Sequence, residues 1–477
     1  MTHFQKPRQL LTWRQFLRRI LPFADVATPD LPLSRLLRLS LFQVSVGMAM
    51  VLLTGTLNRV MVVELHVPTW LVATMVALPL VFAPLRALIG YRSDYHHSAF
   101  GLRRIPYIWF GSLLQFGGFS IMPFALLLLS DTSNDMNFLG KIGAAVAFLL
   151  VGAGLHTTQT AGLALATDLA PVEKRPRVVA LLYVTLLVGM LLSSLLFGKL
   201  LTHFTPQLLI QLIQSAAAAT LLLNVVALWR QEAIDRTRAA APPSRPPFLD
   251  TWRDFSQGGR ASRLLVAVGL GTAGFTMQDI LLEPYGGQVL GMTVSQTTAL
   301  TALLSGGTLA AFALAARVLG RGGNTYRLSA SGAVIGLVAF TAVIFAASLE
   351  STLLFRAGTA LIGFGAGLFA VGTLTAAMDL AEGGHSGLAL GAWGAVQATA
   401  NGVAMAFGGG MRDLVSDLAS TGSLGVKFGN VVVGYEFVYV FEIVLLFSTL
   451  IVMIPLIMRT MDKTPRAPST IGLDQMP

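Results

Sequence analysis

The chain contains 477 residues, of which 54% are hydrophobic and only 12% are charged, and its formal net charge is +10 at pH 7. Soluble domains carry about 25% charged residues, so this composition favours a polytopic membrane protein and excludes an ordinary soluble domain. The sequence has no cysteine, which excludes disulfides, thiolate metal sites and iron–sulfur clusters. Basic loops on one membrane face explain the positive charge better than a nucleic-acid partner does. We therefore expect membrane lipids as partners and no nucleic acid.

Residues 1–37 are largely basic and polar and precede the first long apolar run. Within them, Trp13, Phe16 and Ile20 recur at helical spacing, while Arg14 falls on another face. This pattern predicts a short helix that lies on the cytoplasmic membrane surface. A disordered basic tail is the alternative.

A helix needs about 20 mainly apolar residues to cross a membrane. Twelve segments meet this requirement and predict an all-α polytopic membrane protein. They comprise residues 39–63, 69–90, 106–129, 142–167, 178–201, 207–229, 264–285, 297–319, 328–349, 354–378, 387–410 and 434–458.

Lysine and arginine are concentrated in alternate loops. The N-terminal segment and the loops after the second, fourth, sixth and eighth predicted helices are rich in them, whereas the opposite loops contain few. Because positive charge marks the cytoplasmic side, we predict that both termini are cytoplasmic. The longest break contains "RAAAPPSRPP" (238–247), a composition typical of a linker. The predicted organisation is a six-helix half at 38–230, a cytoplasmic linker at 231–262, a second six-helix half at 263–459 and a cytoplasmic tail at 460–477.

The two halves resemble each other in sequence. "ATDLA" (166–170) recurs as "AMDLA" (377–381), and the Gly55–Glu64 spacing recurs between Gly274 and Glu283. Matches in the same order along both halves indicate a parallel repeat of two six-helix units. Such a repeat is typical of the major facilitator fold.

Charged residues gather at the predicted cytoplasmic ends of the helices. The loop "GYRSDYHHSAFGLRR" (90–104) partly matches the loop motif of the major facilitator superfamily, with Gly90 and Asp94 in place. We predict an inner gate of ion pairs here, formed by Asp94, Arg103, Arg104, Asp168, Glu173, Lys174, Arg175, Arg177 and Asp379. Helix capping and solvation of the loops explain these charges equally well.

A second group of charges lies within the predicted spans, where an ionisable group costs several kcal/mol unless it is paired or hydrated. This cluster between the halves comprises Asn58, Arg59, Glu64, Gln278, Asp279 and Glu283. The repeat register places Arg59 opposite Gln278, so we expect Arg59 to pair with Asp279 or Glu283 and to hold the halves together. In the alternative, both acids lie in water at the outer interface. Pro284 should bend or end its helix.

His156 and Gln159 lie in the middle of a predicted helix, in "GAGLHTTQTAG" (152–162). A neutral imidazole can ligate the magnesium of a chlorin, which makes these two residues candidate pigment contacts, although a buried, hydrogen-bonded histidine is commoner. No Walker loop, His-Glu-x-x-His or Gly-x-Ser-x-Gly motif is present. We therefore expect no enzymatic activity, no catalytic residues and no protein-bound metal.

Several long stretches of the chain resemble the PucC/LhaA family, the bacteriochlorophyll-delivery branch of the major facilitator superfamily. They are "PFADVATPDLPLSRLLRLSLFQVSVGM" (22–48), "GTLNRVMVVEL" (55–65), "RIPYIWFGSLLQFGG" (104–118), "TDLAPVEKRPRVVALLYVTLLVGM" (167–190) and "QDILLEPYGGQVLGM" (278–292). The resemblance implies a protein of the inner or photosynthetic intracytoplasmic membrane. It also implies signature positions at Asn58, Arg59, Glu64, Asp168, Glu173, Lys174, Arg175, Arg177, Gln278, Asp279, Glu283, Pro284 and Tyr285.

The function that the resemblance implies is assembly of bacterial light-harvesting antenna complexes. Such a protein would deliver or bind bacteriochlorophyll, as cargo or bound pigment, and would hold nascent antenna polypeptides, with the core antenna favoured over the peripheral one. The alternative is a secondary transporter of a small solute, driven by protons through Asp279 or Glu283.

Overall fold

The computed structural model of the chain describes residues 32–81, 102, 104–130, 134–171, 175–231, 259–380, 386–421 and 432–461. Every regular element within these ranges is a helix. The predicted surface helix near Trp13, most of the linker and the C-terminal tail lie outside the described residues.

The described helices form twelve rods in chain order. The first rod runs from α2 (Leu33–Met50) into two π-helical segments, η2 (Val51–Leu57) and η3 (Val60–Glu64). The rest of the first half comprises α3 (Thr69–Val81), α5 (Ile105–Leu129), α6 (Asn134–Leu169), α7 (Arg175–Leu200) with η5 (Leu201–His203), and α8 (Pro206–Leu228). The second half comprises α10 (Arg260–Thr276) with α11 (Gln278–Gln288), α12 (Val294–Gly320), α13 (Thr325–Ser348), α14 (Thr352–Leu380), α15 (Ser386–Ser420) and α16 (Val432–Met461).

The all-α polytopic architecture is therefore confirmed. Ten of these helices are long and apolar enough to cross a membrane, and Thr69–Leu80 is a shorter apolar helix within the second predicted span. The eleventh predicted span, 387–410, falls inside α15. Some rods exceed the bilayer: the 36 residues of α6 extend to about 54 Å, whereas a hydrocarbon core is about 30 Å thick.

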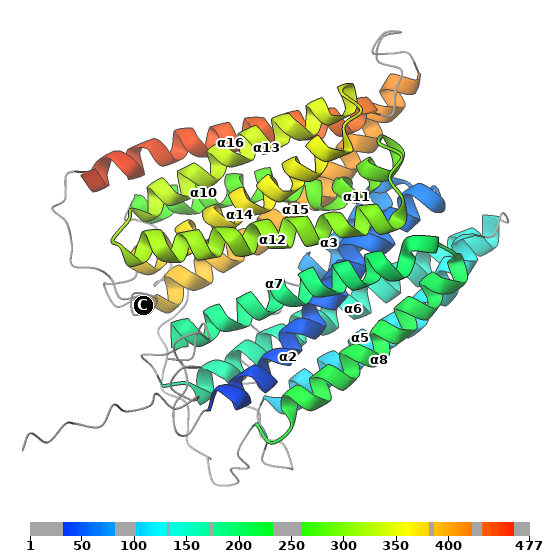
Figure 1. Cartoon of the computed structure of the whole chain (residues 1–477), viewed down its shortest axis with the longest axis horizontal. Helices are drawn as coiled ribbons and strands as arrows, with labels where there is room; N and C mark the ends of the chain where they lie inside the picture. Colours follow the sequence, from blue (N-terminus) through cyan, green and yellow to red (C-terminus); the bar gives the residue numbers. More distant parts are fainter. Residues whose placement is uncertain are drawn as a thin grey trace, which may run out of the picture.

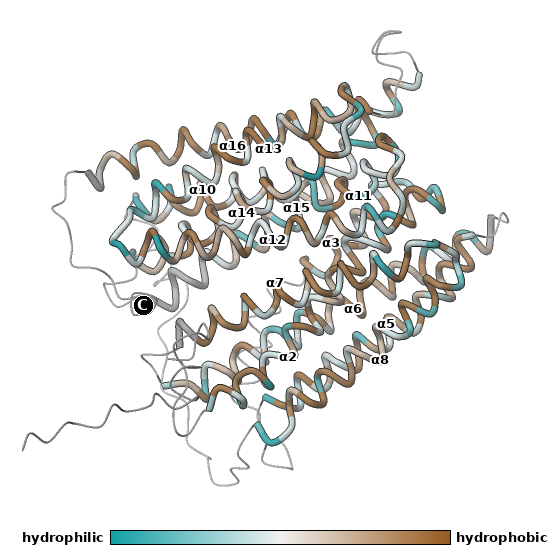
Figure 2. Tube along the Cα trace, in the orientation of Figure 1, coloured by the Kyte–Doolittle hydropathy of each residue, from teal (hydrophilic) through white to brown (hydrophobic). Residues whose placement is uncertain are grey.

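The outward faces of the helices are apolar, as expected for contact with lipid. Phe110, Phe124 and Leu222 are each more than half exposed, and hydrophobic colour runs along most of the helix lengths in Figure 2. Inside the bundles, small residues let helices approach closely. At Gly111 and Gly154, an added Cβ would collide with the facing backbone of α6 or α5.

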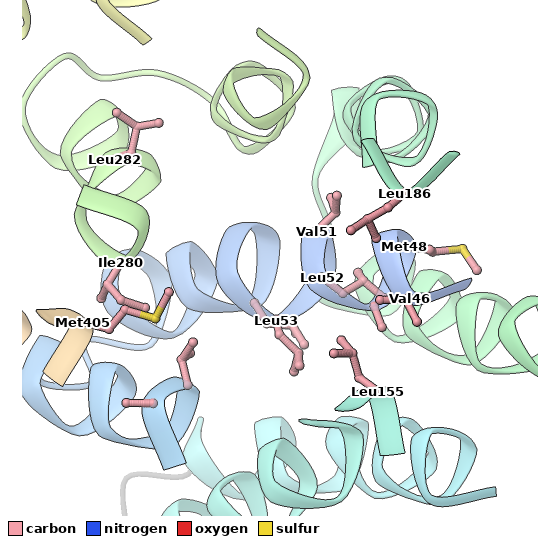
Figure 3. Packing of buried hydrophobic residues seen from close by; sticks show 14 of the residues in the cluster. Val46, Met48, Val51, Leu52, Leu53, Leu155, Leu186, Ile280, Leu282 and Met405 are labelled. Atoms are coloured by element: carbon pink, nitrogen blue, oxygen red, sulfur yellow. The ribbon is translucent and has the colours of Figure 1, made fainter. Parts of the chain in front are cut away.

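The helices divide into two bundles, one from α2 to α8 and the other from α10 to α16 (Figure 1). The bundles meet through α7 with α12, α3 with α15, and α11 with η2 and η3. One continuous cluster of buried hydrophobic residues includes side chains from both bundles. Figure 3 shows part of it, with Leu186 beside Val51 in the first half and Met405 beside Ile280 in the second.

Candidate functional site

The residues that join the two bundles lie along one line of contact, which we call the seam. The seam consists of residues that hydrogen-bond between the halves: Thr56, Asn58, Arg59, Trp70, Ser194, Ile280, Met292, Thr298 and Asp413. The seam residues of the first spanning helix are Thr56, Asn58 and Arg59, and that of α7 is Ser194. In both helices they lie in the later part of the helix, towards the predicted outer side. The seam contains two of the predicted cluster residues, Asn58 and Arg59.

The first spanning helix is π-helical where it meets the second half. Residues Val51–Leu57 and Val60–Glu64 follow the wider i→i+5 hydrogen-bond pattern, with Asn58 and Arg59 between them. π-helical turns are rare and occur frequently at functional sites. In this helix the wider turn stacks residues that are five apart, an arrangement that an α-helix does not provide.

Arg59 forms its ion pair within its own helix. Its Nη1 lies 2.5 Å from Oε1 of Glu64, and its Nη2 donates to the carbonyl of Met292 at 3.2 Å. The expectation that Arg59 pairs directly with Asp279 or Glu283 was therefore wrong. The π-helical turn brings Glu64, five residues on, onto the face of Arg59. Arg59 still connects the halves, because Met292 belongs to the second one.

Each half buries a charged side chain against a glycine of the other half. A Cβ added to Gly55 would collide with Oε1 of Glu283, and one added to Gly287 would lie 3.1 Å from Nη2 of Arg59. Glu283 is 2% exposed and accepts a hydrogen bond from Oγ1 of Thr301 at 2.8 Å. The alternative in which both acids lie in water at the interface is therefore wrong for Glu283.

Asp279 lies one turn before Glu283 and is only partly buried. Its carboxylate accepts a hydrogen bond from the side-chain amide of Gln278. Gln278 itself is 1% exposed. The three predicted residues of α11 thus share one short segment, but Asp279 and Glu283 have separate partners.

Asn58 makes the most direct contact between the first spanning helix and α11. Its Nδ2 donates to the carbonyl of Ile280 at 2.7 Å and to the carbonyl of Thr54 at 3.1 Å. Asn58 is fully buried. Because both neighbours are carbonyl acceptors, the nitrogen of the amide must face them.

A third buried carboxylate, Glu442 of α16, was not among the residues predicted from the sequence. It is fully buried, and its Oε1 accepts a hydrogen bond at 2.8 Å from the backbone amide of Gln278, where α11 begins. A lone acid in the apolar run "YVFEIVLLF" (439–447) was the signal that could have identified it.

The pair Arg412 and Asp413 of α15 was also missed. Asp413 accepts a hydrogen bond from the backbone amide of Trp70 at 2.6 Å, and Arg412 lies 2.7 Å from the other carboxylate oxygen of Asp413. The Arg412 guanidinium also lies over the ring of Tyr435, 4.5 Å from its centroid. Both residues lie beyond the end of the predicted span at residue 410, because α15 extends ten residues further.

The structure describes only part of the predicted cytoplasmic gate. Arg104 and Asp168 form an ion pair at 3.1 Å, but both belong to the first half, so this pair does not join the halves. Asp379 is exposed near the end of α14. Asp94, Arg103, Glu173 and Lys174 lie outside the described residues, as do the side chains of Arg175 and Arg177.

The candidate pigment contacts lie on one face of α6, three residues apart. Gln159 is buried at 8% exposure and His156 is partly buried. Thr158, between them, accepts a hydrogen bond from Gln115 of α5 at 3.3 Å. Their role as pigment contacts stays a prediction.

Two helical bundles joined along a seam define a multi-pass membrane protein with the major facilitator fold. A bacterial homologue of the human lysosomal transporter Spinster, in an inward-facing and unoccupied conformation, matches with a TM-score of 0.64 and 14% identity, over 91% of this chain and 98% of that one. An autoinhibited peptide transporter of the POT family also has a TM-score of 0.64, with 15% identity over 92% of this chain and 99% of that one. At these identities the likeness establishes the fold alone.

The chain belongs to the PUCC protein family, whose model matches residues 56–461. It is 59% identical over 403 residues to Protein PucC of Rhodovulum sulfidophilum, covering 83% of this chain and 89% of that protein. It is 51% identical over 463 residues to an uncharacterized protein in the puhA–bchM intergenic region of Rhodobacter capsulatus, covering 96% and 97%. The 44.5 kDa chain of bacteriochlorophyll synthase of Rhodobacter capsulatus is 28% identical over 407 residues, covering 83% and 91%.

Proposed function

We propose that this protein is a non-enzymatic membrane factor for the assembly of bacterial light-harvesting antenna complexes. It binds or delivers bacteriochlorophyll and holds nascent antenna polypeptides while the complex forms. It acts in the inner, photosynthetic intracytoplasmic membrane with both termini in the cytoplasm.

The observation that carries this proposal is family membership across most of the chain. The match to the PUCC family extends over residues 56–461, and relatives at 51–59% identity cover at least 83% of this chain. The likeness to a protein named as a chain of bacteriochlorophyll synthase supports a connection with the same pigment.

The lipid-facing surface suits apolar clients. Wide apolar faces such as that of Trp109, Phe110 and Phe116 on α5 are open to the bilayer, where pigments and antenna helices also lie. Within the bundle, His156 offers an imidazole of the kind that ligates a chlorin magnesium. It is partly buried beside the buried Gln159, which suits a ligand held inside the helices.

A second candidate function is proton-coupled transport of a small solute. The solved structures of the same fold are transporters, and Glu283 is a carboxylate buried where the two halves meet. This function requires uptake of a solute into sealed vesicles that stops when the proton gradient is dissipated.

The test is gentle affinity purification of the tagged full-length chain from cells that are assembling antenna. The absorbance spectrum of the preparation reports bound bacteriochlorophyll, and mass spectrometry identifies co-purifying polypeptides. We expect chlorin absorbance together with antenna polypeptides, with those of the core antenna enriched over those of the peripheral antenna. Preparations that contain neither pigment nor antenna polypeptides would refute the proposal. Proton-dependent uptake of a solute into sealed vesicles that contain the protein would favour the transporter.

A further inference from the structure

Helix α11 is a short segment that is separated from α10 at its start and contains a proline in its middle. It covers the 11 residues Gln278–Gln288 and is separated from α10 by a turn at Met277. Pro284 lies inside it. In both places the helix lacks one of its own backbone hydrogen bonds, and in both a side chain from another helix supplies the missing group.

At the start of α11, the backbone amide of Gln278 has no helical carbonyl partner and donates to Glu442 at 2.8 Å. Glu442 lies on α16, in the same half as α11. This bond can persist when the halves move relative to one another, and it holds the start of α11 to its own bundle.

In the middle of α11, Pro284 has no amide proton, so the carbonyl of Ile280, four residues earlier, loses its usual helical donor. Nδ2 of Asn58 donates to this carbonyl at 2.7 Å. Asn58 belongs to the first half, between η2 and η3. The proline therefore creates an acceptor in the second half that a residue of the first half satisfies.

We propose that α11 is a movable segment of the seam and that Asn58 is its latch. Glu442 anchors α11 within the second half, and Asn58 fixes its position against the first. Opening of the seam breaks the bond between Asn58 and Ile280 and exposes both groups to water or to a client. The carbonyl of Ile280 needs a donor from Asn58 because residue 284 is a proline and has no amide proton. This inference does not depend on the proposed function, since it concerns the chain alone.

The absence of cysteine from the chain makes the latch directly measurable. Gly198 of α7 is buried against α12, one helical turn beyond the seam residue Ser194, where an added Cβ would lie 3.1 Å from the carbonyl of Ser295 and 4.0 Å from Cβ of Ala299. A single Gly198→Cys substitution places a thiol between α7 and α12. The rate at which a water-soluble thiol reagent labels it in native membranes reports how often the seam opens.

We expect Asn58→Ala and Asn58→Leu to raise the labelling rate at position 198 about threefold to tenfold, the effect of losing one buried hydrogen bond. Leu keeps the branched shape of Asn but has no hydrogen-bond donor. With Pro284→Ala in the same chain, the restored amide at residue 284 can bond to Ile280, and the Asn58 substitutions should then change the rate by less than about twofold.

The control is a single Ala144→Cys substitution. Ala144 is fully buried inside the first half, so its labelling reports unfolding of that half. We expect the Asn58 variants to leave this rate unchanged. An equal effect of the Asn58 variants with proline and with alanine at 284 would overturn the latch, as would a parallel rise at position 144. Labelling at position 198 that is insensitive to both Asn58 variants would also overturn it.

Discussion

The carboxylate of Asp413 in α15 accepts a hydrogen bond, at 2.6 Å, from the backbone amide of Trp70 in α3. Trp70 lies in the first turn of α3, where backbone amides have no partner within the helix. A side chain of the second half therefore completes the start of a helix in the first.

Removing this carboxylate should weaken both the start of α3 and the contact between the halves. For Asp413→Ala we expect a loss of about 0.5–2 kcal/mol, the usual cost of losing an N-terminal cap. Thermal unfolding of the purified protein in mild detergent measures the effect. Asp417→Ala, one helical turn further along and exposed, is the matched control and should leave the unfolding temperature unchanged.

The close approach of Glu283 to Gly55 gives a second prediction. A methyl group at residue 55 would collide with Oε1 of Glu283, so Gly55→Ala must displace a buried acid that bonds to Thr301. We expect a loss of about 1–3 kcal/mol in spite of the higher helix propensity of alanine. Gly117→Ala is the control, because an added methyl there meets nothing within 4 Å. It should be neutral or stabilising by up to about 1 kcal/mol. Equal effects of the two substitutions would contradict the contact.

The ion pair between Arg59 and Glu64 is unequally buried, with side-chain exposures of 5% and 38%. Glu64→Gln leaves a buried cation without its counter-charge and should destabilise the protein by about 1–3 kcal/mol. Arg59→Met removes the buried charge and should cost less, because an apolar side chain of similar size replaces it.

The double variant Arg59→Met with Glu64→Gln should be more stable than Glu64→Gln alone. Asp279→Asn should instead add independently to Arg59→Met, because no direct pair joins residues 59 and 279. Unfolding temperatures of the single and double variants test both statements. If the effects on stability were additive for residues 59 and 64 but not for residues 59 and 279, the result would favour a direct pair between Arg59 and Asp279, as expected from the sequence.

We expect the protein to need the side-chain oxygen of Glu442 as a hydrogen-bond acceptor and not its negative charge. Glu442→Gln keeps an acceptor for the amide of Gln278, so we expect antenna assembly in cells close to that of the unchanged protein. Glu442→Leu removes the acceptor and leaves the amide unsatisfied, so we expect reduced protein abundance and less antenna. A Glu442→Gln variant that is well folded but inactive would contradict this prediction, because it would show that the carboxyl group itself is required.

Most of the fold was predictable because hydropathy and loop charge report directly on membrane spans. Each of the twelve predicted segments overlaps a helix in the described part of the chain, including 264–285, which the structure divides at Met277. Asn58, Arg59 and Glu283 lie where the two halves meet, and polar groups at membrane depth need partners. A joint role for these residues as a cluster stays a prediction. Their partners were not predictable, because the π-helical turns after Met50 change which residues share a face.

The other residues that were not predicted from the sequence also have physical explanations. Glu442 contacts the backbone of Gln278, and a contact between distant segments leaves no local spacing pattern. Arg412 and Asp413 lie beyond the apolar part of α15, where sequence alone places the end of the span too early.

Deletion of the gene that encodes this chain in a phototrophic host tests most directly the claim that the protein is an antenna assembly factor. Membranes of the deletion strain and of the complemented strain are compared by antenna absorbance, total extractable bacteriochlorophyll and transcript levels of the antenna polypeptides. An assembly factor predicts that antenna absorbance falls severalfold while those transcripts persist, and that the intact chain restores it. Normal antenna absorbance in the deletion strain would contradict the account.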